Sequence, residues 1–429
     1  MDFLIKNMYD TDLMGFNDIL TKGELSFMIS EKMLKLTQNN SVIRAMFEEG
    51  ARLSALYGSE NVYDFSLGNP NFPAPEAVKD AIISITAEED PVALHGYMSN
   101  VGYADVRRAI AGSLNEEFDT AFDENNIIMS VGAAGGINVV LKTLLNPGDE
   151  VIVISPFFVE YGNYVSNFDG KLVVVPANPE NFRPDHAAIR AAVTPKTKAV
   201  ILNSPNNPTG VVYSKDDIKQ LADVLNDKER GQGAPIYIIS DEPYRELAYD
   251  GAEVPYLTKY YKNTIVCYSW SKTLTLPGER IGYIVVPSEI DEYQLIFDAA
   301  GIATRILGFV NAPSLMQKVA ARCLNERTDI GSYDINRQLL YKGLTDCGFE
   351  CFFPQGAFYM WVKTPCGDKE FVSTAKKYNI LLVPGTSFAC PGYVRIAYCV
   401  AKKTIENSMP GFKKLAEEYG LGNDYGNGT

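Results

Sequence analysis

The stretch IYIISDEPY at residues 236–244 begins as a buried strand and continues at once into polar side chains. Similar short apolar runs surround it, and helix-length segments separate most of them. Continuous β-rich runs that alternate with helices are typical of strands buried on both faces of a mostly parallel sheet. Besides IYIISDEP, the runs that complete a predicted seven-stranded sheet flanked by helices are NIIMS (126–130), EVIVISP (150–156), KLVVVP (171–176), KAVILNSP (198–205), NTIVCYSW (263–270) and RIGYIVVP (280–287).

The segments on either side of this region have a different texture. Before it, the apolar spacing predicts helices at 41–57 and 75–85. After it, helical patterns mix with short strands such as AFYMWVK and YVRIAYC. We therefore predict an α/β protein with a large domain at 76–305. A smaller α+β domain would be built from the N- and C-terminal segments, 1–75 (with an N-terminal arm) and 306–429.

Charge and histidine content exclude several kinds of chemistry. The 429 residues include 39 Lys and Arg against 53 Asp and Glu, which gives a formal net charge of −14. Such a balance argues against nucleic acid or an anionic membrane as the main partner. The only histidines, His95 and His186, lie far apart in the chain, which argues against a Ser-His-Asp hydrolase and a multi-histidine metal site. Other side chains or a cofactor must carry the chemistry.

The cysteine pattern and the N-terminal segment indicate in which cellular compartment the protein is found. None of the seven cysteines forms a CxxC pair, so we expect free thiols in a reducing cytosol rather than a disulfide framework or a zinc cage. The opening segment MDFLIKNMYDTDLMGF is broken by charges and does not resemble a signal peptide. No run approaches the roughly 18 apolar residues of a membrane span. A cytoplasmic protein is predicted.

Polar groups follow the predicted strands where each strand ends. Asp241 and Tyr244 follow one strand, the loop 204–210 follows a second, and the segment 269–272 follows a third. The small-residue run 131–136 follows the first strand and lies at a predicted helix start. Ligands of open α/β sheets bind outside the carboxyl ends of the strands. We therefore expect these groups to meet in one site.

These loops resemble the signatures of a known family. The motifs SxSK…PGxRxG, DEPY, NxPNNPTG and YVRIAYC are similar to those of the class I/II aminotransferases, pyridoxal-phosphate enzymes of fold type I typified by aspartate aminotransferase. The resemblance runs in the family's order from about Phe65 to Leu415. It implies that the large domain at 76–305 binds pyridoxal 5'-phosphate as cofactor, that amino acids and 2-oxo acids are the small-molecule substrates, and that the protein is a homodimer with shared active sites.

The resemblance also implies roles for the residues around the cofactor ring. Lys272 would form a Schiff base with the cofactor aldehyde, since a desolvated lysine near cationic groups can act as nucleophile and then as base. Asp241 would pair with the pyridine nitrogen and keep the ring an electron sink. Tyr244 and Asn207 would donate hydrogen bonds to the phenolic oxygen. Phe158 would stack on the ring, with Phe157 as the competing register.

Further residues match the family's phosphate and substrate ligands. Arg395 would bind the substrate α-carboxylate, and Gly68 would let the backbone approach the substrate closely. Arg305 is either a reader of a distal carboxylate across the dimer or a solvated residue at a helix end. The phosphate ligands implied are Arg280, Ser269, the backbone N–H groups of Ala133 and Ala134, and Tyr97 from the neighbouring subunit.

Several of these residues also have a plain structural interpretation. Asp241 could cap the next helix, and Asn207 could only shape a turn. Tyr244 could pack in the core, Arg395 could form an internal salt bridge, and Gly68 could be an ordinary turn glycine. These alternatives stay open at this point.

The sequence therefore predicts a ping-pong aminotransferase. It would move an amino group between an L-amino acid, aspartate or glutamate above others, and a 2-oxo acid. Two rivals remain open. A lyase or decarboxylase with the same cofactor is one, because the cofactor residues do not fix the reaction outcome. A non-catalytic cofactor-binding regulatory module is the other.

Overall fold

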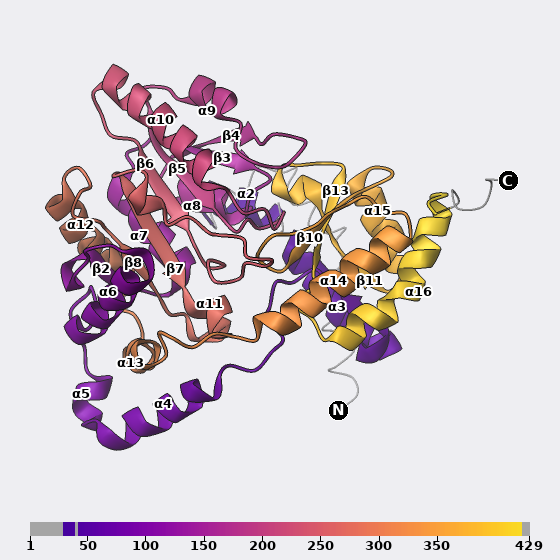
Figure 1. Cartoon of the computed structure of the whole chain (residues 1–429), viewed down its shortest axis with the longest axis horizontal. Helices are drawn as coiled ribbons and strands as arrows, with labels where there is room; N and C mark the ends of the chain where they lie inside the picture. The colour runs from indigo at the N-terminus through magenta and orange to yellow at the C-terminus, as the bar shows by residue number, and fades with distance from the viewer. Residues whose placement is uncertain (1–28, 39–41, 423–429) are drawn as a thin grey trace.

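A seven-stranded sheet forms the centre of the larger of two lobes in the computed structural model, which describes residues 29–38 and 42–422 (Figure 1). The strand order is β2-β8-β7-β6-β5-β3-β4, and only β8 runs antiparallel to its neighbours. The predicted seven-stranded, mostly parallel sheet is thus confirmed. Its strands are β2 (Ile127–Ser130), β3 (Glu150–Ser155), β4 (Lys171–Pro176), β5 (Thr197–Asn203), β6 (Tyr237–Asp241), β7 (Thr264–Ser269) and β8 (Gly282–Val285).

Helices cover both faces of this sheet, which explains why its strands are continuous apolar runs. Side chains alternate along a strand, so Val151 and Val153 of β3 enter one core while Ile152 and Ile154 enter the other. One face packs on α7 (Gly132–Leu144), α8 (Glu160–Asn167) and α12 (Tyr293–Ile306). The other face packs on α4 (Glu76–Glu88), α6 (Ala104–Phe118), α9 (His186–Ala192), α10 (Lys215–Gln232) and α13 (Ser314–Arg322).

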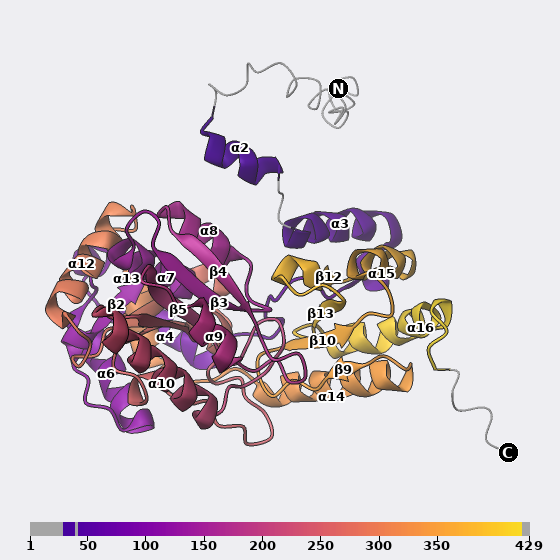
Figure 2. The same ribbon diagram turned by 90° about the horizontal axis from the view of Figure 1, so that it is seen from above.

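The smaller lobe combines helix α3, from before the large sheet, with α14, α15 and α16 from after it (Figure 2). β1 pairs in parallel with β11, which ties the segment before the large sheet to the C-terminal region. A second, antiparallel sheet has the order β12-β13-β10-β9. The helices and strands of the smaller lobe are β1 (Tyr63–Asp64), β9 (Cys351–Phe352), β10 (Tyr359–Lys363), β11 (Ile380–Leu381), β12 (Val383–Pro384), β13 (Tyr393–Ala397), α3 (Val42–Tyr57), α14 (Ile330–Asp346), α15 (Asp368–Ala375) and α16 (Lys402–Glu418).

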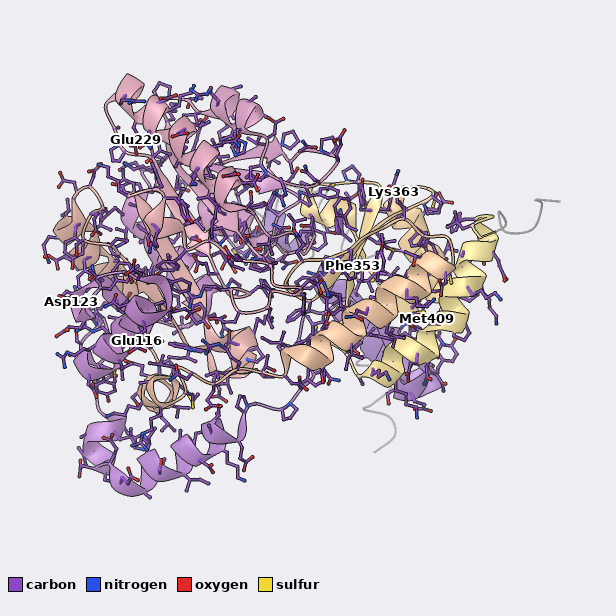
Figure 3. The ribbon with its side chains drawn as sticks, in the orientation of Figure 1. Glu116, Asp123, Glu229, Phe353, Lys363 and Met409 are labelled. Atoms are coloured by element: carbon purple, nitrogen blue, oxygen red, sulfur yellow. The ribbon has the colours of Figure 1, made fainter. Side chains whose placement is uncertain are left out.

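Close helix packing holds the smaller lobe together. Side chains fill the space between α14 and α16 near Met409 (Figure 3). A Cβ atom added to Gly343 on α14 would lie 2.3 Å from Met409 Sδ, so the two helices approach as closely as a glycine allows. Interiors packed at this density tolerate added volume poorly.

The predicted domain limits stay a prediction, and the structure suggests one change to them. Helix α13 packs against α4, α6 and the short α5 (Pro91–His95), all of which belong to the larger lobe. We therefore propose that the chain enters the smaller lobe between Arg322 and Ile330 rather than at residue 306. The short helix α2 (Glu31–Gln38) precedes α3, and the predicted arm at residues 1–28 lies outside the described residues.

Two backbone hydrogen bonds hold the loop after β5 against the smaller lobe. The N–H groups of Gln355 and Gly356 both donate to the carbonyl of Gly210, at 2.8 and 2.9 Å. A Cβ atom on Gly356 would lie 2.6 Å from Pro205 Cβ, so the contact needs a glycine there. The loop at 204–210 is thereby held at the border of the two lobes.

Within the described ranges, no helix combines the length and apolar character that a membrane crossing requires.

Candidate active site

A cavity lies where the carboxyl ends of β5, β6 and β7 meet the first turn of α7 and the smaller lobe. Residues from both lobes line it, as expected for ligand sites in open α/β sheets. Of the residues predicted from the sequence, those that line it are Gly68, Ala133, Ala134, Phe158, Asn207, Asp241, Tyr244, Ser269, Lys272, Arg280 and Arg395. Lining residues that sequence reasoning missed include Leu67, Ile137, Tyr164, Asn203, Ser271 and Tyr359.

Lys272 lies on the short helix α11 (Trp270–Thr273), directly after β7. The Ser269 hydroxyl caps this helix by accepting a hydrogen bond from the N–H of Ser271 at 3.2 Å. The Lys272 ammonium donates to the carbonyl of Gly68 at 2.7 Å. Burial lowers the pKa of Lys272 to about 8, and the positive charge of Arg395 adds to this lowering. About a tenth of the Lys272 amine is therefore neutral at pH 7, far more than of an ordinary lysine, and this share can act as a nucleophile.

Asp241 ends β6 and is buried at the floor of the cavity. Its Oδ2 accepts a hydrogen bond from the Tyr161 hydroxyl, whereas Oδ1 is buried and has no hydrogen-bond partner among the described residues. Burial raises the pKa of Asp241 to about 7, against the lowering effect of the Tyr161 hydrogen bond. A buried carboxylate oxygen without a donor is costly, so this site suits a ligand that brings an N–H or a positive charge.

The start of α7 and Arg280 form an anion subsite. Ala133 and Ala134 lie in the first turn of α7, where backbone N–H groups lack an intrahelical acceptor. Arg280 has a left-handed backbone (φ 53°), and its guanidinium donates to the carbonyl of Val131 at 3.2 Å. The Ser269 and Ser271 hydroxyls lie 2.7 Å apart and face the same cavity. Together they offer positive charge and several donors to a phosphate.

Arg395, on β13, lines the cavity, and its hydrogen-bond acceptors are neutral groups. Its guanidinium donates to Asn207 Oδ1 at 3.1 Å and to the carbonyl of Ser66. The ring of Tyr359 packs against it, 4.5 Å from the guanidinium carbon to the ring centroid. In the part of the chain that the structure describes, no carboxylate lies within ion-pair distance of Arg395, so the internal salt bridge is not found. Its charge is available to a ligand carboxylate.

Aromatic side chains complete the walls. Phe158 lines the cavity, whereas Phe157 is 9% exposed and packs in the core. Phe158 meets Tyr161 edge to face, with ring centroids 5.6 Å apart. The Tyr244 hydroxyl lies 2.9 Å from that of Tyr359.

Two residues predicted for the site lie outside this cavity. Tyr97 is 93% exposed, and Arg305 is exposed in the last turn of α12. Both were predicted to act on a neighbouring subunit's site, which a single chain does not test.

Comparisons with known proteins agree with this geometry. A family model described as aminotransferase class I and II matches residues 60–409. Aromatic-amino-acid aminotransferase 2 of Thermococcus litoralis is 31% identical over 393 residues, covering 89% of this chain and 96% of that protein. Aspartate aminotransferase of Pyrococcus abyssi is 32% identical with the same coverage. A solved amino transferase structure from Eubacterium rectale superimposes with a TM-score of 0.89 at 46% identity, covering 92% of this chain and 99% of that one.

The matched residues include every residue that lines the cavity, from Leu67 to Arg395. The similarity therefore covers the site as well as the scaffold. The chain belongs to the class I and II aminotransferases, enzymes that transfer nitrogenous groups.

Proposed function

We propose that this enzyme holds pyridoxal 5'-phosphate in the cavity and moves an amino group between an L-amino acid and a 2-oxo acid. The observation that carries this proposal is the unpartnered Oδ1 of buried Asp241, in one cavity with Lys272 and the anion subsite. These three features suit the ring nitrogen, the aldehyde and the phosphate of a single cofactor. When bound, that cofactor supplies an electron sink for the carbon that loses its proton.

Each cavity residue then has a task toward the cofactor. Asp241 would hold the ring N–H through Oδ1, and Arg280 would bind the phosphate together with Ser269 and the first turn of α7. Tyr244 and Asn207 would donate hydrogen bonds to the phenolic oxygen, and Phe158 would cover the ring. Lys272 would carry the cofactor as a Schiff base.

The substrate's amino acid part would be held and deprotonated by this chain's own groups. Arg395 would bind the α-carboxylate, and Gly68 leaves room beside it because it has no side chain. Once released from the cofactor by the substrate's amine, Lys272 would take the α-proton and return it to the former aldehyde carbon of the cofactor, as a base with a pKa near working pH can do. The first product would leave before a second 2-oxo acid binds, which is a ping-pong sequence.

We propose aspartate or glutamate as the amino donor, read by Arg305 from a second subunit. The two curated relatives compared above are named for aspartate and for aromatic amino acids, so they leave the side chain undecided. The cationic residues lining the cavity, Lys272, Arg280 and Arg395, already have tasks. Arg305 has no ion-pair partner among the described residues, so its charge is available for a distal carboxylate.

Exposed apolar side chains support a homodimer with shared sites. Ile302 and Ile306, on the same helix as Arg305, are 51% and 57% exposed, and Tyr97 is 93% exposed. Large exposed apolar groups mark surfaces that a partner covers.

All seven cysteines are free in the structure, which supports the proposal of a reducing, cytoplasmic environment.

The proposed chemistry predicts colour and amino transfer. The purified protein mixed with pyridoxal phosphate should turn yellow and transfer nitrogen from glutamate to members of a panel of 2-oxo acids. Lys272→Ala should lose the yellow band and the transfer, whereas Lys369→Ala, an exposed control on α15, should keep both. A colourless mixture, or release of ammonia or carbon dioxide in place of transfer, would contradict the proposal and favour a binding module or a lyase.

The lowered pKa of Lys272 predicts how its reactivity depends on pH. In the cofactor-free protein, Lys272 is protonated below pH 8 and neutral above it. Reductive methylation followed by mass spectrometry should therefore reach half its maximal rate at Lys272 near pH 8, while the lysine of a short unstructured peptide added to the same reaction should require about two more pH units. Equal profiles for the two lysines would show that burial does not activate Lys272.

The dicarboxylate assignment predicts a selective effect of Arg305→Ala. The loss of an ion pair shielded between subunits should reduce kcat/KM for aspartate by at least about 30-fold. Activity with alanine or phenylalanine should change little, and the surface control Arg190→Ala should resemble wild type with every donor. Unchanged turnover of aspartate in Arg305→Ala would remove the main support for this substrate.

A further inference from the structure

Tyr359, at the start of β10, lies between the proposed cofactor site and the proposed substrate site. It is 2% exposed, its ring packs on the Arg395 guanidinium, and its hydroxyl lies 2.9 Å from the hydroxyl of Tyr244. A Cβ atom added to Gly68 would lie 2.0 Å from this hydroxyl, so the glycine leaves the space that the phenol fills.

The two phenols share one hydrogen bond, and its direction matters for the site. Tyr244 has a single proton, which it cannot give to Tyr359 and to a cofactor oxygen at once. Among the described residues, the Tyr359 hydroxyl has no hydrogen-bond partner other than Tyr244. When Tyr244 donates into the cavity, Tyr359 must therefore donate to Tyr244. Hydrogen bonds arranged in such a chain strengthen one another.

We infer that Tyr359 is a positioning residue that donates its proton to Tyr244 and so directs the Tyr244 proton toward the phenolic oxygen of bound pyridoxal phosphate. This inference rests on the proposed function. Burial raises the pKa of Tyr359 to about 12 and holds that of Tyr244 well above its usual value, so both hydroxyls keep their protons at working pH. The charged or titratable groups that face the pair are Arg395, Asp241 and Cys399, with Lys272 across the cavity.

Because the chain stabilises a negative phenolic oxygen, it should lower the pKa of the Schiff base at Lys272. The test is a pH titration of the yellow absorption band in the holoenzyme. Tyr359→Phe should raise the apparent pKa by about 0.4 to 1, the worth of one neutral hydrogen bond. Tyr244→Phe should raise it further, and Tyr244→Phe combined with Tyr359→Phe should match Tyr244→Phe alone. An unchanged apparent pKa in Tyr359→Phe would overturn the inference. So would a Tyr359→Phe effect that is just as large when Tyr244 is also replaced by phenylalanine.

A matched control and a second replacement keep the test decisive. Tyr398→Phe also removes a buried hydroxyl of the smaller lobe, but that hydroxyl donates to the carbonyl of Ala357 and contacts Tyr249, and neither tyrosine lines the cavity. It should leave the titration unchanged. Replacing Tyr359 with 3-fluorotyrosine keeps its shape and makes it a stronger donor, so the apparent pKa should fall; an unchanged or higher value would contradict the inference even if Tyr359→Phe failed to fold.

The same samples separate this inference from the proposed function. A wild-type protein without a yellow band would defeat the proposed function itself, whereas a normal band with no response to Tyr359→Phe would defeat only the inference. The KM for the 2-oxo acid gives a further readout. It should stay near the wild-type value in Tyr359→Phe, because phenylalanine keeps the ring over Arg395.

Discussion

The buried carboxylate of Asp241 constrains the rest of this site. Strand β6 carries it into the interior, Tyr161 satisfies one of its oxygens, and the other has no donor within the described residues. A lone carboxylate in such a place is costly and shifts its pKa toward the neutral form. A ligand that supplies the missing N–H would remove this cost. Lys272 and the anion subsite then lie in the same cavity to bind the aldehyde and the phosphate of that ligand.

Local charge in the cavity opposes the charge of the whole chain. The formal net charge is −14, yet the charged groups lining the cavity are three cations, Lys272, Arg280 and Arg395, and the single carboxylate Asp241. Neutral carbonyl and amide oxygens hold these cations: Gly68 accepts from Lys272, and Asn207 from Arg395. Because they are not neutralised inside the protein, their field acts on phosphate and carboxylate ligands.

Much of the fold and of the cavity follows from local sequence patterns. The strands are recognisable because each is a short apolar run, and the residues that follow them meet because parallel strands end at one edge. The antiparallel direction of β8 could not be predicted, since periodicity does not record direction. Tyr161 and Tyr359 were missed for a related reason. Their hydroxyls contact Asp241 and Tyr244 from 80 and 115 residues away, and the chain has 25 tyrosines with nothing local to distinguish these two.

The unpartnered Oδ1 of buried Asp241 is explained if it receives a proton-bearing ring nitrogen. Nitrogen-15 NMR of the holoenzyme loaded with ring-labelled pyridoxal phosphate reports that proton directly. We predict the chemical shift of a protonated pyridine at pH 8, and the shift of a deprotonated ring in Asp241→Ala. A deprotonated ring in the wild-type enzyme would contradict the assignment of Asp241, and with it the explanation of why this carboxylate is buried without a second donor.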